Sequence, residues 1–440
     1  MKRIHSGWLL ATLLFASTVP AQPARAGEGV GAAQVDAIYP EVEKLYIDLH
    51  RNPELAFHEQ RTAATLAARV KALGYEVTTG VGGTGLVAIL KNGPGPVVML
   101  RTELDALPIE EKTGLPFAST VTTKRDSGEI VPVSHMCGHD IHMSAWAGTA
   151  ELMAKSREHW HGTLMLVGQP AEEIVAGATA MLHDGLFTRF PKPDYALGMH
   201  DEQSLPAGVI GFHPGFFRAN STGIDMTVYG KGGHGAFPQR AIDPVVIAAR
   251  IVLGLQTIVS RENDPVDPAV ITVGSIHGGS ASNIIPDQVK LQITVRSLDP
   301  AVHKRLLAAI ERQAKGEALA MNAPKEPLIE IKSSTDAVYN DPGLTQRMVA
   351  AARAALGADH VVEMPAQMGG EDFSQFGLAG VRAVLLHVGA VDAAKLEASR
   401  RSGVPLPGVH SPLWAPEREP TIKAAIRAEV AILTDLLNGA

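Results

Sequence analysis

The sequence predicts an α/β protein in which a discontinuous main domain, built on a mostly parallel sheet covered by helices, carries an inserted α+β domain. Short apolar runs alternate with segments of helical periodicity in the first half of the chain, which is typical of parallel strands joined by crossover helices. After about Pro214 the strands become amphipathic and follow one another closely, and from about Asp341 the first pattern returns. A chain of 440 residues also exceeds what one hydrophobic core usually serves.

The N-terminus has the form of a secretory signal. Lys2 and Arg3 precede an apolar run over residues 8–16, and small residues then lead to an A-x-A sequence that ends at Ala26. The apolar run is too short to span a bilayer. We therefore expect a signal peptide over residues 1–26, cleavage after Ala26, a secreted or periplasmic protein, and no membrane partner.

The first part of the main domain is expected over residues 27–213. Helical spacing of apolar residues predicts its helices, and short apolar runs bounded by glycine or proline predict its buried strands. In chain order we expect helices over 37–49 and 59–73, strands over 85–90 and 97–100, a helix over 141–156, a strand over 163–167, a helix over 176–186 and a strand over 195–199.

The inserted domain is expected over residues 214–331, and the second part of the main domain over 332–440. In the insert, the two helices are long enough to cover one face of an antiparallel sheet. Its predicted strands are 221–230, 269–279 and 288–298, and its predicted helices are 244–259 and 300–319. The main domain then resumes with a helix over 342–356, a strand over 382–388 and a helix over 417–437.

Composition describes a globular chain with a formal charge of -7, which is a poor surface for nucleic acid. The single cysteine, Cys137, cannot form an internal disulfide. In a secreted protein an odd thiol is an intermolecular bridge, a reactive group, a metal ligand or an inert buried residue. Its neighbours His135, His139 and His142 favour the metal ligand, because thiolate and imidazole suit transition metals.

Polar side chains follow three of the predicted strands at the point where each strand ends. The strings RTELDALP, GQPAEE and MHDE contribute Asp105, the adjacent Glu172 and Glu173, and His200. Ligands of open α/β sheets bind outside the carboxyl ends of the strands, so these side chains are expected to converge on one site.

Nine short strings occur in order along nearly the whole chain that follows the signal: LHRNPEL, RTELDALPI, HMCGHDIH, QPAEE, GMH, GGHGAFP, NIIPD, GGEDF and VHSP. Together they resemble the amidohydrolase branch of the aminoacylase and carboxypeptidase dinuclear metallopeptidases, which includes hippurate hydrolases and auxin-amino-acid conjugate hydrolases. The resemblance implies a catalytic main domain with two divalent metal ions per subunit, drawn from Zn, Mn, Co or Ni. It also implies that the insert is a lid that dimerises.

The resemblance also implies the roles of individual residues. The metal ligands it implies are Cys137, His139, Glu173, His200 and His410. Glu172 takes the position of the general base. Adjacent glutamates direct their side chains apart, so one can bind metal while the other faces a water molecule, whose proton it can take.

For the remaining candidate residues, more than one role is compatible with the sequence. Asp105 would suit a carboxylate that orients a ligand or bridges through water, and His135 and His142 are either ligands or supports of ligands. Two further candidates are acids: Glu103 stands where the family usually has aspartate, which leaves the metal preference open, and Glu371 either lines the site or is an ordinary loop acid.

Two residues of the insert are implied to bind substrate. The resemblance brings His234 of GGHGAFP to the active site of its own or the partner subunit, where it polarises the scissile carbonyl or its oxyanion. Asn283, in SASNIIPD, is a second donor for the carboxylate or amide of the substrate.

These expectations combine into a secreted, homodimeric, metal-dependent amidohydrolase that cleaves N-acyl amino acids or similar small conjugates. A carboxypeptidase or dipeptidase acting on short peptides is the alternative within the class. A noncatalytic periplasmic metal or ligand carrier is a third reading, against which Glu172 argues because binding alone needs no base. A cysteine-nucleophile enzyme is the fourth, and it predicts inactivation by alkylation even with metal bound.

Overall fold

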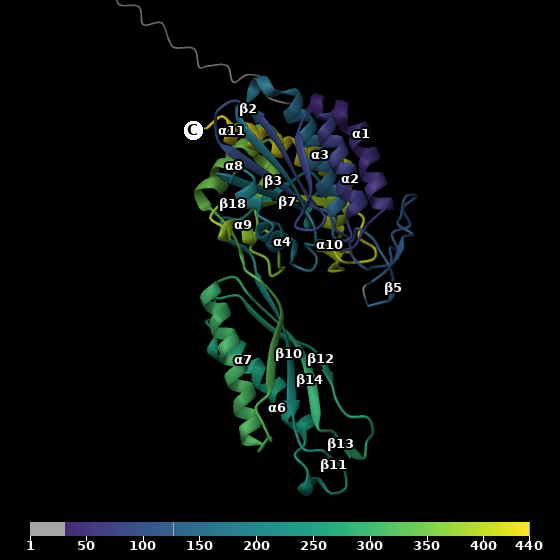
Figure 1. Cartoon of the computed structure of the whole chain (residues 1–440), viewed down its shortest axis with the longest axis vertical. Helices are drawn as coiled ribbons and strands as arrows, with labels where there is room; N and C mark the ends of the chain where they lie inside the picture. The colour runs from purple at the N-terminus through teal and green to yellow at the C-terminus, as the bar shows by residue number, and fades with distance from the viewer. Residues whose placement is uncertain (1–30, 126, 440) are drawn as a thin grey trace, which may run out of the picture.

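The computed structural model describes residues 31–125 and 127–439, so the predicted signal peptide lies outside the described residues. A main domain and an elongated insert that extends from it make up the molecule (Figure 1). The predicted fold class is confirmed, because the main domain is a large, mostly parallel sheet flanked by helices and the insert is a separate antiparallel sheet with two helices.

The main sheet has eight strands in the order β1-β2-β6-β3-β7-β18-β8-β17. Its central strands β6, β3, β7 and β18 are mutually parallel. Strand β2 is antiparallel to both β1 and β6, and β8 is antiparallel to β18. The strands are β1 (Glu76–Val81), β2 (Gly85–Asn92), β3 (Val97–Glu103), β6 (Gly162–Gln169), β7 (Tyr195–Pro206), β8 (Ile210–Phe212), β17 (Val361–Glu363) and β18 (Arg382–Val391).

Helices cover both faces of this sheet because its central strands are apolar on both sides. Leu164 and Leu166 of β6 pack on one face with α1, α2, α3, α8 and α11, while Met165 and Val167 pack on the other with α4, α5 and α9. The helices are α1 (Ala32–Arg51), α2 (Gln60–Ala72), α3 (His139–Lys155), α4 (Gly177–His183), α5 (Leu186–Arg189), α8 (Pro342–Leu356), α9 (Ser374–Leu378), α10 (Ala393–Ser402) and α11 (Arg418–Leu437).

The insert is a four-stranded antiparallel sheet in the order β12-β14-β10-β15, with two helices packed on one face (Figure 1). Its elements are β10 (Asn220–Tyr229), β11 (Gly233–His234), α6 (Pro244–Thr257), β12 (Ala269–His277), β13 (Ile284–Ile285), β14 (Gln288–Ser297), α7 (Pro300–Ala320) and β15 (Leu328–Thr335). Short pairs outside it are β4 (Thr122–Lys124) with β5 (Ile130–Pro132), and β9 (Gly215–Arg218) with β16 (Val338–Asn340).

Three helices begin with the same Asp-Pro signal. Asp243, Asp299 and Asp341 each cap a helix by accepting a hydrogen bond from a backbone N–H of its first turn, at 2.8, 2.6 and 2.7 Å. Proline follows each cap at the first helical position, where its missing N–H costs nothing. This local chemistry explains why the starts of α6, α7 and α8 agree with the sequence-based bounds.

One strand of the four-stranded sheet of the insert was not predicted, and neither was the short pair β11 and β13. β15 pairs with β10 from Thr227 opposite Leu328 to Ser221 opposite Thr335, so the insert extends beyond the expected boundary at residue 331, which falls inside the strand. The strand is an edge strand whose side chains are mostly exposed. Its hydrophobic alternation is therefore weak, and its polar end, KSST, resembles a loop.

The segment Pro244–Glu262, which is α6 and its continuation, is long and apolar enough to cross a membrane by length and composition alone. The core helix of a soluble protein passes the same test. Ile247, Ile251 and Leu255 of this helix are fully buried against the sheet of the insert.

Candidate metal centre

The candidate site lies at the carboxyl ends of the parallel strands β6, β3 and β7, where α3 begins. Gly138, which precedes the first residue of α3, has a left-handed backbone with φ 78°. A Cβ at this position would collide with the carboxylate of Asp201, so only glycine allows the turn. This turn directs Cys137 and His139 toward the strand ends.

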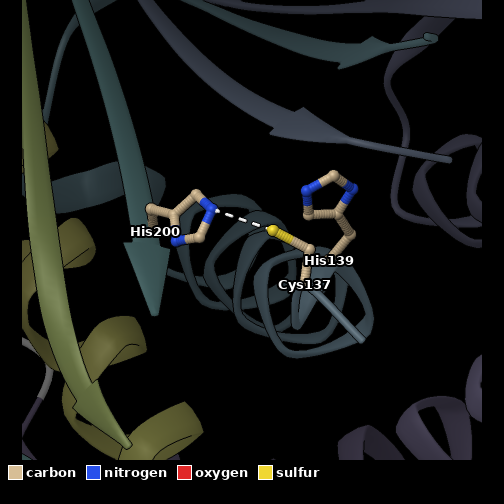
Figure 2. Close-up of side chains that lie close together, drawn as sticks. All are labelled: Cys137, His139 and His200. Atoms are coloured by element: carbon tan, nitrogen blue, oxygen red, sulfur yellow. Dashed lines mark hydrogen bonds between the residues drawn. The ribbon is translucent and has the colours of Figure 1, made fainter. Parts of the chain in front are cut away.

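The Cys137 thiol lies between histidines from different elements. Its Sγ is 3.6 Å from Nε2 of His200 in β7 and 3.2 Å from Nε2 of His410, which lies in the loop before α11. Figure 2 shows Cys137 with His200 on one side and the His139 ring on the other. Four of the predicted ligands, Cys137, His139, His200 and His410, therefore lie together here.

The two glutamates of the loop after β6 complete this cluster. Glu173 lies 3.4 Å from Nε2 of His410 and 3.9 Å from Nε2 of His139, and Glu172 lies 3.8 Å from the same nitrogen of His139. The potential ligand atoms of Cys137, His139 and His200 lie within 4.8 Å of one another, as do those of Cys137, Glu173 and His410. Cys137 belongs to both groups.

The chemistry of the cluster fits a divalent metal. Nε2 of His139 and Oε1 of Glu173 are buried and have no hydrogen-bond partner among the described residues, which is costly unless something else satisfies them. His139 donates its other nitrogen, Nδ1, to the backbone carbonyl of Asp105 at 2.8 Å. That bond leaves Nε2 as the free ligand atom and fixes its direction.

Without a cation, burial makes ionisation of the acids of this cluster unfavourable. Burial, and then the charges of Glu371 and Glu173, raises the pKa of Glu172 well above its usual range. Burial raises the pKa of Glu173 to about 7, and the neighbouring charge of Asp105 adds to this. Bound cations would offset both effects, since positive charge stabilises the ionised carboxylates.

Asp105 holds the loop that carries the two glutamates. Its Oδ1 accepts a hydrogen bond from the backbone N–H of Glu172 at 3.1 Å, and its Oδ2 accepts one from the N–H of Glu173 at 3.0 Å. The expected water bridge differs from this arrangement, because both carboxylate oxygens are used by the loop. Asp105 is therefore a positioning residue for the glutamates.

Backbone strain is concentrated around this loop. Ala171 and Val175, on either side of the glutamates, have φ of 51° and 49°, and His410 has φ of 65°. Such values cost free energy for residues other than glycine and are found at functional sites. Glu59, for which the sequence gives no signal, stabilises this conformation: its buried carboxylate accepts a hydrogen bond from the N–H of Ala171 at 2.8 Å.

A buried network lies behind the cluster. Nδ1 of His142 donates to Glu103 at 2.9 Å, and Nε2 of His142 accepts from the backbone N–H of Asp201 at 2.8 Å. Both nitrogens of His142 are therefore occupied. This agrees with a support of the ligands, which is one of the two roles expected for His142, and not with a ligand. Arg101 donates to both Glu103 and Glu371, and the second oxygen of Glu371 is buried without a partner among the described residues.

His135 is also buried, and neither of its ring nitrogens has a partner in the described part of the chain. Burial lowers the pKa of His135 to about 4, so the ring is neutral.

His234 and Asn283 lie far from this cluster. His234 is in β11 and Asn283 directly precedes β13, and these two short strands pair at the distal end of the insert (Figure 1). His234 is exposed, and the N–H of the following Gly235 donates to the carbonyl of Asn283 at 2.8 Å. A role for His234 in the site of its own subunit does not agree with this arrangement.

Two cavities adjoin the cluster. One has a volume of about 670 Å³ and includes Cys137, Glu172, Glu173, His200 and His410 in its wall. The other, of about 560 Å³, meets it at Glu173 and Ile174 and is lined mainly by apolar groups, among them Leu55, Leu107 and Pro108. Both volumes are in the range of small-molecule sites.

Comparison with known proteins places this geometry among hydrolases. The model of the peptidase family M20/M25/M40 matches residues 99–399. The chain is 38% identical over 299 residues to a hippurate hydrolase of Campylobacter jejuni, covering 68% of this chain and 73% of that protein. It is 35% identical over 336 residues to thermostable carboxypeptidase 2 of Saccharolobus solfataricus, covering 74% of this chain and 80% of that protein.

Solved structures share the whole fold. The Bacillus subtilis protein YxeP, described as a dinuclear metal binding peptidase, superposes with a TM-score of 0.73 at 28% identity, covering 90% of this chain and 98% of that one. A protein of methicillin-resistant Staphylococcus aureus, named as an aminohydrolase, gives a TM-score of 0.81 at 29% identity, covering 92% and 98%.

Proposed function

The chain belongs to the peptidase family M20/M25/M40 and is a hydrolase of amide bonds, and from this premise we propose that it cleaves N-acyl amino acids or similar small conjugates. The observation that carries the proposal is Glu172, a buried carboxylate 3.8 Å from Nε2 of His139, in the wall of a cavity of about 670 Å³. A base beside a ligand cluster is needed for hydrolysis and is not needed for metal storage.

Two divalent ions per subunit would be held by the residues around Cys137. The cluster divides into two groups that share its thiol, one completed by His139 and His200 and the other by Glu173 and His410. Thiolate, imidazole and carboxylate together suit Zn, Mn, Co and Ni. A bound cation would also keep the only cysteine of the chain from oxidation, which matters in an exported protein.

When bound, the metal ions supply Lewis acidity that polarises the amide carbonyl and lowers the pKa of water at the site. Glu172 takes a proton from the attacking water while the water oxygen forms a bond to the carbonyl carbon. The same carboxyl then gives that proton to the amide nitrogen as the carbon–nitrogen bond breaks. The products are a carboxylic acid and a free amino acid, so no other reactant is required.

A carboxypeptidase or dipeptidase is the second candidate, and the similarity to thermostable carboxypeptidase 2 favours it. A panel of N-acyl amino acids and dipeptides, assayed with Zn, Mn, Co and Ni in turn, separates the two. The first function predicts higher kcat/KM for the acyl amino acids, and the second for the peptides. Absence of hydrolysis of every member with stoichiometric metal bound would instead indicate a carrier.

We also propose a homodimer in which His234 completes the site of the partner. Its support is the position of His234 at the distal end of the insert, exposed and away from its own metal centre (Figure 1). Mixing inactive His234→Ala and Glu172→Gln homodimers under conditions of subunit exchange tests this. Activity should reappear, since one of the two sites in a mixed dimer then has both residues, whereas no recovery contradicts the proposal.

Export is proposed from the N-terminal sequence alone. When the full chain is expressed in a bacterial host, the mature protein should be recovered from the periplasm or medium with Gly27 as its first residue. A cytoplasmic protein that retains residues 1–26 contradicts it, and mass spectrometry distinguishes the two.

A further inference from the structure

We infer that Arg218 and Arg296 form an anion subsite that selects substrates whose released amino acid has an acidic side chain, that is, N-acyl aspartates or glutamates. Both arginines line the cavity of about 670 Å³ that also holds Cys137, Glu173 and His410. The inference rests on the proposed function and specifies its substrate class.

Neither guanidinium has an acidic partner in the part of the chain that the structure describes. Arg218 donates to the side-chain carbonyl of Gln367 at 2.9 Å and to the backbone carbonyl of Gly370 at 3.3 Å. Arg296 donates to the backbone carbonyl of Met368 at 2.8 Å. These neutral oxygens hold the guanidinium groups in place and leave their charge uncompensated.

The carboxylate of Glu202 is linked to Arg218 only through Gln367, and it has partners of its own. The amide nitrogen of Gln367 donates to Glu202 at 2.6 Å, and Glu202 also interacts with Nδ1 of His387 at 2.9 Å. The Nε group of Arg218 is buried and has no partner among the described residues. A charged, half-buried side chain therefore has a hydrogen-bond donor that no described residue satisfies.

The two arginines come from different units and repel each other across the cavity. Arg218 ends β9, beside the main sheet, and Arg296 lies in β14 of the insert. Burial lowers the pKa of Arg296, and the charge of Arg218 lowers it further. Two close cations beside a metal centre are unfavourable unless an anion joins them, and no side chain of the described residues provides one.

Space for the Arg218 guanidinium is created by glycine. A Cβ at Gly369 would lie 2.8 Å from the terminal nitrogen of Arg218, and a Cβ at Gly370 would lie 3.3 Å from Ser221. The glycines of the GGEDF string thus keep this wall of the cavity open. The arrangement is a formed site with a fixed cation, not a mobile surface side chain.

The number of cations sets the class of substrate. An N-acyl amino acid has one carboxylate next to the scissile amide, and one guanidinium satisfies it by a bidentate pair. The second guanidinium then has a partner only if the substrate has a second carboxylate. The acyl group can occupy the apolar cavity at Leu107, Pro108 and Ile174 on the other side of Glu173.

Substrates that differ only in charge test the inference. The metal-loaded full chain is assayed with N-acetyl-L-glutamate and N-acetyl-L-glutamine, which are nearly identical in shape. We expect kcat/KM to favour the glutamate by at least about tenfold, the value of one charge-assisted contact. In Arg218→Gln the ratio should fall to about one, and Arg218→Lys should retain part of it.

The control is Arg305→Gln, which removes a surface arginine of the insert paired with Asp267 and should leave the ratio unchanged. A wild-type preference for glutamine, or a ratio that Arg218→Gln does not alter, overturns the inference while hydrolysis itself still supports the proposed function. If neither compound is hydrolysed, calorimetric binding of the same pair decides the subsite, and the panel of N-acyl amino acids and dipeptides separately tests the proposed function. In calorimetry, equal affinity for the two compounds would overturn the inferred subsite. If the variants do not fold, the preference of the wild-type protein for glutamate over glutamine decides the inference.

Discussion

The carboxylate of Asp105 accepts a hydrogen bond from the backbone N–H of Glu172 at 3.1 Å, which joins the end of β3 to the loop after β6. The same carboxylate binds the next N–H, that of Glu173, at 3.0 Å. One buried acid thus fixes the backbone at both glutamates. Asp105 therefore acts on the two glutamates through their backbone N–H groups.

Asp105→Asn should therefore weaken the site without removing any ligand. An amide has one acceptor oxygen in place of two, so its NH₂ group would face one of the two backbone N–H groups. Loss of such outer contacts typically costs about 10- to 100-fold in metal affinity or activity. Metal affinity by competition with a chelator and kcat with saturating metal should both fall, and retention of both at wild-type values would contradict the positioning role.

Cys137 should be protected by metal and not act as a nucleophile. Cys137→Ser is expected to reduce the bound metal, because serine replaces a soft ligand by a poor one. Alkylating reagents should leave the metal-loaded protein active and should inactivate it after chelation. Rapid inactivation of protein that still has its full metal content, measured by atomic spectroscopy, would instead identify a nucleophilic thiol.

Removal of metal should lower stability as well as activity. The buried, unpartnered atoms of His139 and Glu173 lose their partner on chelation, and a ligand that binds only the folded state stabilises it. We expect the Tm of the chelated protein to be lower by several degrees, and two equivalents of Mn, Zn or Co per subunit to restore both Tm and turnover. Full recovery with one equivalent would contradict a dinuclear site.

Glu429 gives a pH test that is independent of catalysis. It is buried in α11, where Oε2 accepts a hydrogen bond from Thr149 at 2.6 Å, and burial raises the pKa of Glu429 to about 8. The folded state thus binds the proton more tightly than the unfolded state, in which the pKa is near 4.5. Between about pH 4.5 and pH 8 this group makes folding less favourable as pH rises.

Glu429→Gln keeps an acceptor for Thr149 and removes this titration. The variant should gain Tm relative to wild type at pH 9, by several degrees, and should gain little at pH 5, where the folded wild type already holds the proton. Exposed Glu330→Gln serves as the matched control and should show no such difference between the two pH values. Equal shifts for Glu429→Gln at both pH values would contradict a buried, protonated glutamate.

Sequence patterns anticipated the main sheet and its site because the signals are local. Residues that leave parallel strands must meet at one edge, so Asp105, Glu172 and His200 could be placed together without coordinates. Cys137 and His139 flank Gly138, so both lie at the start of α3. The close approach of Gly138 to Asp201 shows the constraint behind that spacing.

Other features depend on tertiary placement and have no local signal. β15 is an exposed edge strand, and a strand without a buried face lacks the alternation that identifies strands. His234 stands in a string that suggests an active site, yet the length of the insert carries it away from its own metal centre. Arg218 and Arg296 come from different units, and only the folded chain brings them to one cavity.

The turnover of metal-loaded Glu172→Gln shows whether Glu172 acts as the general base. Glutamine preserves the size of the side chain and its place in the cavity but cannot take a proton from water. We expect the variant to retain two metal ions and the wild-type Tm, and kcat for N-acyl amino acids to fall by about 10²- to 10⁴-fold. Near wild-type kcat in a variant with full metal content would contradict this role of Glu172.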